Sequence, residues 1–370
     1  MQTECSLIEI AIVGAGMAGL TCAQQLHQAG YDVVVFDKSR GVGGRMATRR
    51  AQGTWADHGL RYFEDSPEGD LTALLSLLRD RGLIHPWTDH VQELGPDGQL
   101  RPSRDRHPRY VAALGINSVA KFLATGLTLH REHRVSAIAP TPAGQWHLTF
   151  APPTPDVQAP DPVLAKILVL AIPAAQALDL LAPVPQIPGE SLAALEAVTF
   201  DPCMTVMAGY RPHPTLENLD WQAIALPQDP LLSWISLESS KRSLPAAPVL
   251  VLHSSPSFAA ENFDAPNLTE AAHALLQRAA SVLQISYWQQ PDWLQVHRWR
   301  YAIPQQSHHD RALAATQPAP WICGGDWCGG EGLSSAYRSG FAMAHQVNQW
   351  LEGRPLKGEQ AWMDLVSEKL

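Results

Sequence analysis

The stretch from Ile10 to Gly19 constrains the fold of this chain most strongly, because a short apolar run breaks there into Gly14-Ala15-Gly16-Met17-Ala18-Gly19. The pattern predicts a strand, a tight turn and the start of a helix. Gly14 permits the turn, Gly16 leaves room for a phosphate to approach the backbone, and Gly19 lets the helix pack on the strand. The free N–H groups of the helix then face an anion. We therefore expect all six residues of the turn to contact a dinucleotide pyrophosphate.

The residues that follow support a dinucleotide site. Helical spacing of small and apolar residues continues to Gly30, and an apolar strand then runs from Tyr31 to Asp37. Asp37 lies eighteen positions after Gly19, where an acid that hydrogen-bonds an adenosine ribose is expected. A carboxylate disfavours a 2′-phosphate, so FAD or NAD is expected rather than NADP. Lys38 follows directly and is assigned to the same site.

The length and charge of the chain limit the function classes. With 370 residues it can form two substantial cores, or one α/β body with an inserted lobe. A net charge of −9 argues against a general nucleic-acid surface. No Lys or Arg precedes Lys38, and no uninterrupted apolar run is long enough to cross a bilayer. We expect a cytoplasmic protein with no membrane span.

The five cysteines are scattered and form no Cys-x-x-Cys pair. Such spacing favours reduced, buried thiols over a disulfide framework or a metal centre. No metal site is therefore expected.

A second glycine-rich stretch begins directly after Lys38 and contains Gly41, Gly43, Gly44 and Arg45. Its glycines allow the backbone to lie close to a ligand, and Arg45 can bind a pyrophosphate through two parallel hydrogen bonds.

Together these segments resemble those of FAD-dependent amine-oxidase-like flavoproteins, which share a glycine fingerprint, an acid at the end of the second strand and a Gly-x-Gly-Gly-Arg loop. The resemblance implies an α/β fold, with a doubly wound, Rossmann-like FAD-binding domain and an inserted mixed α/β substrate domain. It also implies noncovalent FAD. The domains implied are FAD-binding over 1–65, 105–177 and 319–352, substrate-binding over 66–104 and 178–318, and a tail over 353–370.

The same resemblance implies the FAD contacts beyond the first turn. Along the pyrophosphate and flavin they are Gly43, Gly44, Arg45, Met46, Leu60, Arg61 and Tyr62. Val135 would meet the adenine through its backbone, and Asp326 of a Gly-Asp motif would bind a ribityl hydroxyl. Leu333 and Ala336 open a late helix whose N-terminus would face the flavin, where its partial positive charge stabilises a reduced ring.

Late in the second lobe, His297-Arg298-Trp299-Arg300-Tyr301-Ala302 resembles a segment of the renalase-like subgroup. Where related proteins commonly show Ala-Gln, this chain has Leu60-Arg61, which would place a cation near the flavin ring. The candidate catalytic residues are His58, Arg61, Tyr62, Trp299, Arg300 and Tyr301.

Three functions remain open. A renalase-like oxidase would take hydride from 2- or 6-dihydro-NAD(P) and pass electrons to O2, giving NAD(P)⁺ and hydrogen peroxide. This reaction needs no strong base, and arginines between Arg101 and Arg109, with Arg61 and Arg300, would hold substrate phosphates. The first alternative is a flavin amine oxidase for small primary or secondary amines, whose charge suits Arg61 and Arg300 poorly. The second is an FAD-binding protein without turnover.

Overall fold

The computed structural model describes residues 7–358 except 67, 155, 217–218 and 243–246. Cys5 and most of the predicted tail lie outside these residues. The described cysteines, Cys22, Cys203, Cys323 and Cys328, are free and buried, which confirms the prediction for them.

The first sheet has eight strands and is mixed, with parallel pairing among its central strands. Its path runs β10-β11-β12-β1-β2-β9, with β19 beside the end of β12 and β18 beside β19. The strands are β1 (Leu7–Val13), β2 (Val33–Asp37), β9 (Thr128–Arg131), β10 (Val135–Pro140), β11 (Trp146–Phe150), β12 (Val163–Leu170), β18 (Leu313–Ala315) and β19 (Trp321–Cys323).

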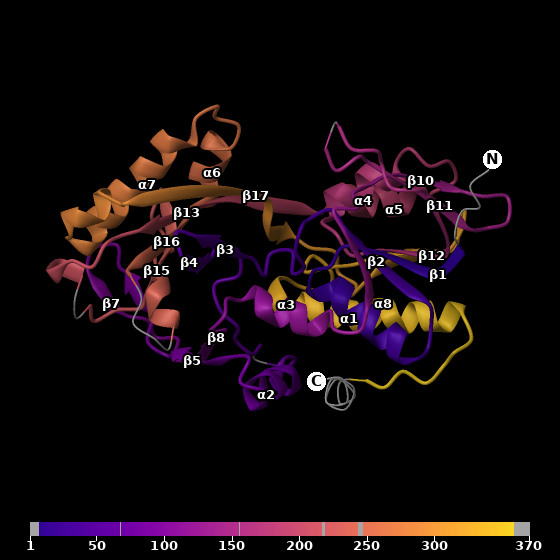
Figure 1. Ribbon diagram of the computed structural model, residues 1–370, viewed down its shortest axis with the longest axis horizontal. Coiled ribbons are helices and arrows are strands. Elements are labelled where there is room, and N and C mark those ends of the chain that lie inside the picture. Colours follow the sequence, from indigo (N-terminus) through magenta and orange to yellow (C-terminus); the bar gives the residue numbers. More distant parts are fainter. Residues whose placement is uncertain (1–6, 67, 155, 217–218, 243–246, 359–370) are drawn as a thin grey trace.

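Helices cover both faces of this sheet (Figure 1). Because side chains alternate along a strand, Ile10 and Ile12 of β1 join one core while Ala11 and Val13 join the other. On the first face lie α1 (Met17–Gln28), α2 (Thr72–Asp80), α3 (Asn117–Leu123) and α8 (Gly332–Trp350); on the second lie α4 (Ala174–Leu181) and α5 (Gly189–Glu196). The predicted doubly wound α/β fold is thus confirmed.

The second layer is a seven-stranded sheet built from chain segments between β2 and β19. Its order is β17-β13-β16-β15-β14-β6-β7. The strands are β6 (Gln92–Leu94), β7 (Leu100–Pro102), β13 (Thr199–Gly209), β14 (Ala223–Ala225), β15 (Leu232–Leu237), β16 (Val249–Ser254) and β17 (Trp293–Gln306). Helices α6 (Pro256–Asn262) and α7 (Leu268–Leu283) cover one face of it (Figure 1).

Two short strand pairs and three short 3-10 turns complete the described residues. One of these pairs is a hairpin of β3 (Thr48–Ala51) and β4 (Thr54–Asp57); the other is an antiparallel pair of β5 (His85–Thr88) and β8 (Arg109–Val111), with β6 and β7 between them in the chain. The turns are η1 (Pro214–Leu216), η2 (Glu238–Lys241) and η3 (Ser286–Gln289).

The segments that pack with the eight-stranded sheet extend past the domain boundaries expected at 178 and 318. Leu181 of α4 and Leu195 of α5 pack into the core of the eight-stranded sheet, and β18 pairs with β19 of that sheet. The apolar face of α4 and α5 is buried there, because β10 and β12 offer it a matching surface. The division into domains stays a prediction, and this packing favours a second domain that begins near Thr199 and ends before Leu313.

None of the described helices is long and apolar enough to cross a membrane.

Candidate functional site

The first glycine turn has the geometry that its sequence predicts. Gly14 has φ +107°, and a Cβ there would lie 2.4 Å from the Ala171 carbonyl oxygen. A Cβ at Gly19 would lie 2.0 Å from the Gly14 oxygen, so the helix packs tightly on the turn. At Gly16 a Cβ would meet no atom within 4 Å. Gly16 is the N-cap of α1 and offers no side-chain hydrogen bond, so no cap side chain satisfies the first amides of the helix, those of Met17 and Ala18.

Asp37 connects this turn to the end of β2. Its two carboxylate oxygens accept hydrogen bonds from the backbone amides of Ala15 and Ser39, each at 2.7 Å. The side chain is buried, and each oxygen keeps further acceptor capacity for a ribose hydroxyl. Beside it, the Lys38 ammonium contacts the Gln176 amide oxygen at 3.4 Å.

The second glycine loop lies against the first. The Gly43 amide donates to the Ala15 oxygen at 2.8 Å, and a Cβ at Gly44 would lie 3.5 Å from Gly16 Cα. Gly43 itself has φ +117° and packs on the backbone of buried Met46. The two loops therefore form one cradle around the open space at Gly16.

Arg45 binds a carboxylate of this chain. Its Nη1 and Nη2 donate to the two oxygens of Asp326, both at 2.6 Å. Nη1 also donates to the Tyr301 and Ala302 carbonyls at 3.2 and 3.1 Å. The pair joins two residues that the sequence assigns separately, to the pyrophosphate and to the ribityl chain.

A third glycine-rich turn precedes α8. Gly329, Gly330 and Gly332 all have positive φ, and the helix begins without a side-chain cap. Leu333 is half-buried and Ala336 is buried in the first turns. Two uncapped helix N-termini, of α1 and α8, therefore offer amides to an anionic or electron-rich ligand.

Gly59 lies between Arg45 and Trp299. A Cβ there would come within 2.0 Å of the Arg45 oxygen and 3.2 Å of Trp299 Cζ2. The Leu60 amide donates to the same Arg45 oxygen at 2.8 Å, and Trp299 Nε1 donates to the His58 oxygen at 2.8 Å. Residues 58–60 are thus held between the second glycine loop and the second sheet, and their predicted contact with a flavin stays a prediction.

His58, His297 and Trp299 form a ring cluster. The His58 ring stacks on Trp299 at 5.4 Å between centroids and meets His297 edge-on at 4.9 Å. Burial lowers the pKa of His58 to about 3, and repulsion from His297 and Arg49 adds to the effect. Burial and the charges of Arg49 and Arg298 lower the pKa of His297 to about 4. Both imidazoles are therefore neutral at neutral pH and are weak bases.

Arg61 points into the second sheet and is partly buried there. Its Nε donates to His253 Nδ1 at 3.1 Å, its Nη2 donates to Ser233 Oγ at 3.2 Å, and the guanidinium lies 4.8 Å from the Trp234 ring. All three partners are neutral, because burial also holds the pKa of His253 well below its usual value. Among the described residues no carboxylate forms an ion pair with Arg61, and Glu64 acts on it only at longer range.

Neighbouring buried cations differ from Arg61 in this respect. Lys241 pairs with Glu238 at 2.6 Å and also donates to the Arg61 carbonyl at 2.8 Å. Arg109 pairs with Asp105 at 2.6 Å and lies over the Tyr62 ring. An uncompensated cation that is shielded from water is costly, and the Arg61 guanidinium lacks the counter-ion that Lys241 and Arg109 have.

Tyr62 belongs to an aromatic wall beside Arg61. Its ring lies 5.7 Å from Trp234 and 6.4 Å from Trp87. A wall of this kind suits a planar substrate.

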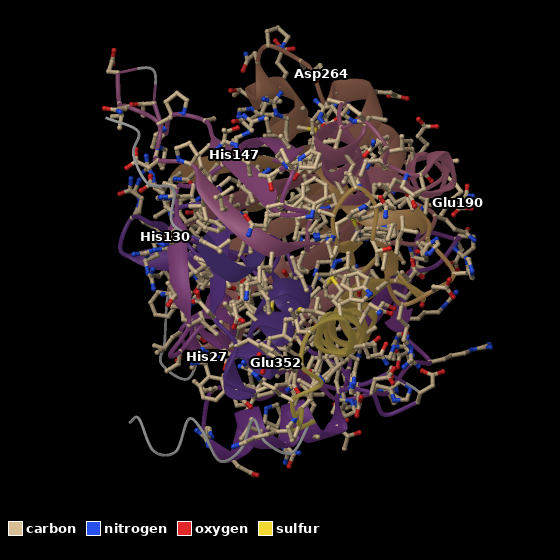
Figure 2. All side chains as sticks on the ribbon, turned by 90° about the vertical axis from the view of Figure 1, so that its right-hand side faces the viewer. His27, His130, His147, Glu190, Asp264 and Glu352 are labelled. Carbon is tan, nitrogen blue, oxygen red and sulfur yellow. The ribbon has the colours of Figure 1, made fainter. Side chains whose placement is uncertain are left out.

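Other predicted residues lie apart from the Arg61 guanidinium. Arg300 pairs with Asp264 at 3.0 Å on the outer face of β17, because it alternates with Trp299 along the strand. Asp264 lies at the periphery in Figure 2. The Tyr301 ring packs on Phe200 at 5.5 Å, and its carbonyl accepts from Arg45. Val135 is buried at the start of β10.

The arginine cluster between Arg101 and Arg109 is partly neutralised within its own loop. Arg101 pairs with Asp97, and Arg109 pairs with Asp105.

Sequence reasoning missed His253, Ser233 and Lys241. A histidine at the end of the apolar run Val249-Leu250-Val251-Leu252 is a detectable signal, because a polar residue closing a buried strand usually has a specific partner. Ser233 and Lys241 carry no comparable signal in the sequence.

Comparison with known proteins identifies the family. Residues 97–348 match the flavin containing amine oxidoreductase family, and residues 12–78 match an NAD(P)-binding Rossmann-like domain. Curated relatives match locally: AofH of Mycobacterium tuberculosis, named as a flavin-containing monoamine oxidase, is 38% identical over 76 residues, and 15-cis-phytoene desaturase of Synechococcus elongatus is 39% identical over 57. These matches span 20% and 15% of this chain, but only 16% and 12% of the relatives.

Solved structures share the fold over most of the chain. A putrescine oxidase bound to putrescine has a TM-score of 0.67 at 14% identity, and cyclohexylamine oxidase of Brevibacterium oxydans has 0.68 at 13%. Each likeness covers 93% of this chain and 99% of the other. The open cradle at Gly16, the two uncapped helix N-termini and the buried acid Asp37 fit the FAD that this family uses.

Proposed function

Because the chain belongs to the flavin containing amine oxidoreductase family, we propose that it is an oxidase for misreduced dihydronicotinamide dinucleotides. The substrates would be 2- or 6-dihydro-NAD(P), and the products NAD(P)⁺ and hydrogen peroxide. The protein is an FAD-dependent oxidoreductase. When bound, FAD would supply the acceptor for the hydride and the route of the electron pair to O2, and one proton from water balances the formation of hydrogen peroxide.

The observation that carries this proposal is the missing counter-ion of Arg61. An amine substrate carries an ammonium, and two like charges about 4 Å apart repel by ~4 kcal/mol at the effective dielectric constant of a protein surface. A dihydropyridine ring is neutral, and its carboxamide oxygen can accept from the guanidinium. The negative phosphates of the dinucleotide add a favourable long-range attraction. Arg61 therefore favours this substrate over a cationic amine.

The two neutral histidines also suit the proposed reaction. Loss of hydride from a dihydropyridine gives an aromatic pyridinium directly, so no proton has to leave the ring. His58 and His297, with pKa values near 3 and 4, would position and enclose the ring rather than accept a proton. Trp299, which holds the His58 carbonyl, fixes their arrangement.

The aromatic wall supports a planar ring as the reacting group. The Tyr62 ring lies within ring contact of both Trp87 and Trp234, and the Arg61 guanidinium lies over Trp234. A nicotinamide ring stacked there would exclude water and hold its C–H bond toward the cofactor.

The second candidate is a flavin amine oxidase. The specific observation in its favour is the shared fold with putrescine oxidase and cyclohexylamine oxidase, which act on amines. In this chain the amine would have to bind beside Arg61 without a carboxylate to balance the two charges.

Oxygen uptake distinguishes the candidates. Purified protein reconstituted with FAD would be supplied in turn with 2-dihydro-NAD, 6-dihydro-NAD, their phosphorylated forms and a panel of primary and secondary amines. The proposal expects oxygen uptake and peroxide with the dihydronicotinamides only. Uptake with amines alone would replace it by the second candidate, and no uptake with any compound would favour a binding protein without turnover.

A further inference from the structure

Three side chains that commonly bind metals follow one another after β17, namely His308, His309 and Asp310. One possible ligand atom from each lies within 4.8 Å of the other two. None of them belongs to the site described above. We propose that they form a binding site for a divalent transition-metal ion, with Zn²⁺ as the expected occupant.

The separations of the two imidazole nitrogens from the Asp310 carboxylate oxygen suit ligands of one small ion. His308 Nε2 lies 3.9 Å from Asp310 Oδ2, and His309 Nε2 lies 3.0 Å from the same oxygen. Zinc binds imidazole nitrogen and carboxylate oxygen at about 2.0–2.2 Å, so tetrahedral ligands on one ion stand roughly 3.5 Å apart. The two observed separations lie on either side of this value. Two imidazoles and one carboxylate also favour zinc over magnesium or calcium, which prefer oxygen ligands alone.

His308 provides an independent sign that a ligand is missing. Its side chain is only 10% exposed, and its buried Nε2 has no hydrogen-bond partner among the described residues. Buried polar atoms are nearly always satisfied, so an orphan nitrogen needs an explanation. An ion between His308 and the two neighbouring side chains would satisfy it.

The backbone holds His308 in place, while the other two ligands face solvent. Its amide donates to the Trp327 oxygen, and its carbonyl accepts from the Gly329 amide, both at 2.8 Å. The side chains of His309 and Asp310 are 82% and 66% exposed. An ion can therefore enter directly from water, and its fourth position stays open to a water molecule.

The proposed metal site lies beside the turn that precedes α8, so a bound ion would affect the stability of this turn. The strand-like contact between His308 and Cys328 connects it to the turn that carries Asp326 and leads through Gly329 into α8. An ion that fixes the His308 side chain would brace this turn. We expect it to raise the melting temperature and to slow the release of FAD. Metal binding itself does not depend on the identity of the substrate, so its failure and that of the proposed oxidase function are separable.

The test is zinc binding by the FAD-loaded protein. Metal-free wild type, prepared with a chelator, would be titrated with Zn²⁺ against a chromophoric competitor, and melting curves would be recorded with and without the ion. We expect one Zn²⁺ per chain and a higher melting temperature. His308→Ala and Asp310→Asn should each weaken binding by at least about tenfold. His90→Ala is the matched control, because His90 has an adjacent acid, Asp89, and no third metal-binding side chain joins them among the described residues.

Two variants, His308→Ala and Asp310→Asn, are needed in case one of them does not fold. Asp310 is exposed, so Asp310→Asn should fold even if His308→Ala does not. The proposed site would be overturned if Asp310→Asn bound Zn²⁺ as tightly as wild type, or if His90→Ala lost as much Zn²⁺ affinity as the two site variants. Zinc binding that leaves the melting temperature and the rate of FAD release unchanged would overturn the bracing role.

Discussion

Arg45 and Asp326 form a bidentate ion pair in which both nitrogen–oxygen distances are 2.6 Å, although 281 positions separate the two residues in the chain. The pair joins the loop after β2 to the turn after β19. Arg45 also holds the Tyr301 and Ala302 carbonyls, so a single guanidinium connects these two segments with β17.

This pair should control FAD affinity. Asp326→Asn removes the charge that orients Arg45, and charged hydrogen bonds contribute about 1.5–3 kcal/mol each, so we expect FAD to bind roughly ten- to a hundredfold more weakly. Fluorescence of released flavin measures the dissociation constant. Asp264→Asn, which breaks the exposed pair with Arg300, is the control and should leave it unchanged. An unaltered FAD affinity in Asp326→Asn would exclude this role.

Alanine substitutions at two glycines of the first turn should have different effects, one on FAD binding and the other on the stability of the fold. Gly16 has φ −83° and open space for a Cβ, so Gly16→Ala should change the free energy of unfolding of the FAD-free protein by less than about 0.5 kcal/mol while weakening FAD binding. Gly14→Ala should instead destabilise the fold by roughly 1–3 kcal/mol, because its φ is positive and the carbonyl of Ala171 blocks a Cβ.

Denaturant melts and flavin titrations of both variants test this separation. Gly189→Ala is the control, since Gly189 is equally open but lies at the start of α5. Unimpaired FAD binding in Gly16→Ala would show that the cradle is not the pyrophosphate site.

Replacing Arg61 should change the preference between substrates. Arg61→Gln keeps hydrogen-bonding groups near His253 and Ser233 but removes the charge, so we expect weaker binding of a dihydronicotinamide dinucleotide by about tenfold and improved binding of amines. Spectral titration of the bound flavin measures both. Arg300→Gln is the matched control, because Arg300 lies on the opposite face of β17. Equal effects of the two substitutions would refute a specific role for Arg61.

The buried histidines should make stability depend on pH. A histidine whose pKa falls on folding resists protonation in the native state. Its favourable contribution to the free energy of unfolding is therefore complete above the unfolded pKa of about 6.5, and it is lost as the pH falls toward the folded pKa. For His58 and His297 the folded values are about 3 and 4. Below pH 6.5 the free energy of unfolding should therefore decrease by up to ~1.4 kcal/mol per pH unit for each histidine.

Urea unfolding at a series of pH values measures this slope. His58→Gln should reduce the slope between pH 6 and 4.5, where about one proton of difference is lost. His90→Gln, at an exposed position, should not. A His58→Gln slope equal to that of wild type would mean that His58 is not held neutral.

The sequence predicts those parts of the fold that depend on local patterns. The turn from Gly14 to Gly19, the acid at Asp37 and the helix that opens near Leu333 each combine residue spacing with a conformational need, and each is present. The sequence could not show which of the two sheets α4 and α5 pack against, because the pattern of an amphipathic helix does not reveal which apolar surface covers it.

Contacts across the fold were equally inaccessible from the sequence. The Arg45–Asp326 pair and the neutral surroundings of Arg61 join segments that lie far apart in the chain, and no spacing rule connects them. Arg300 shows the reverse problem. Its motif suggests a role beside Trp299, but alternation along β17 turns its side chain toward Asp264.

Anaerobic mixing of the FAD-loaded protein with 6-dihydro-NAD is the most direct test of the proposed function. We expect that one equivalent bleaches the flavin absorbance, that one equivalent of NAD⁺ forms, and that admission of O2 restores the absorbance with one equivalent of hydrogen peroxide. Flavin that stays oxidised with both dihydronicotinamide isomers, yet bleaches with an amine, would contradict it.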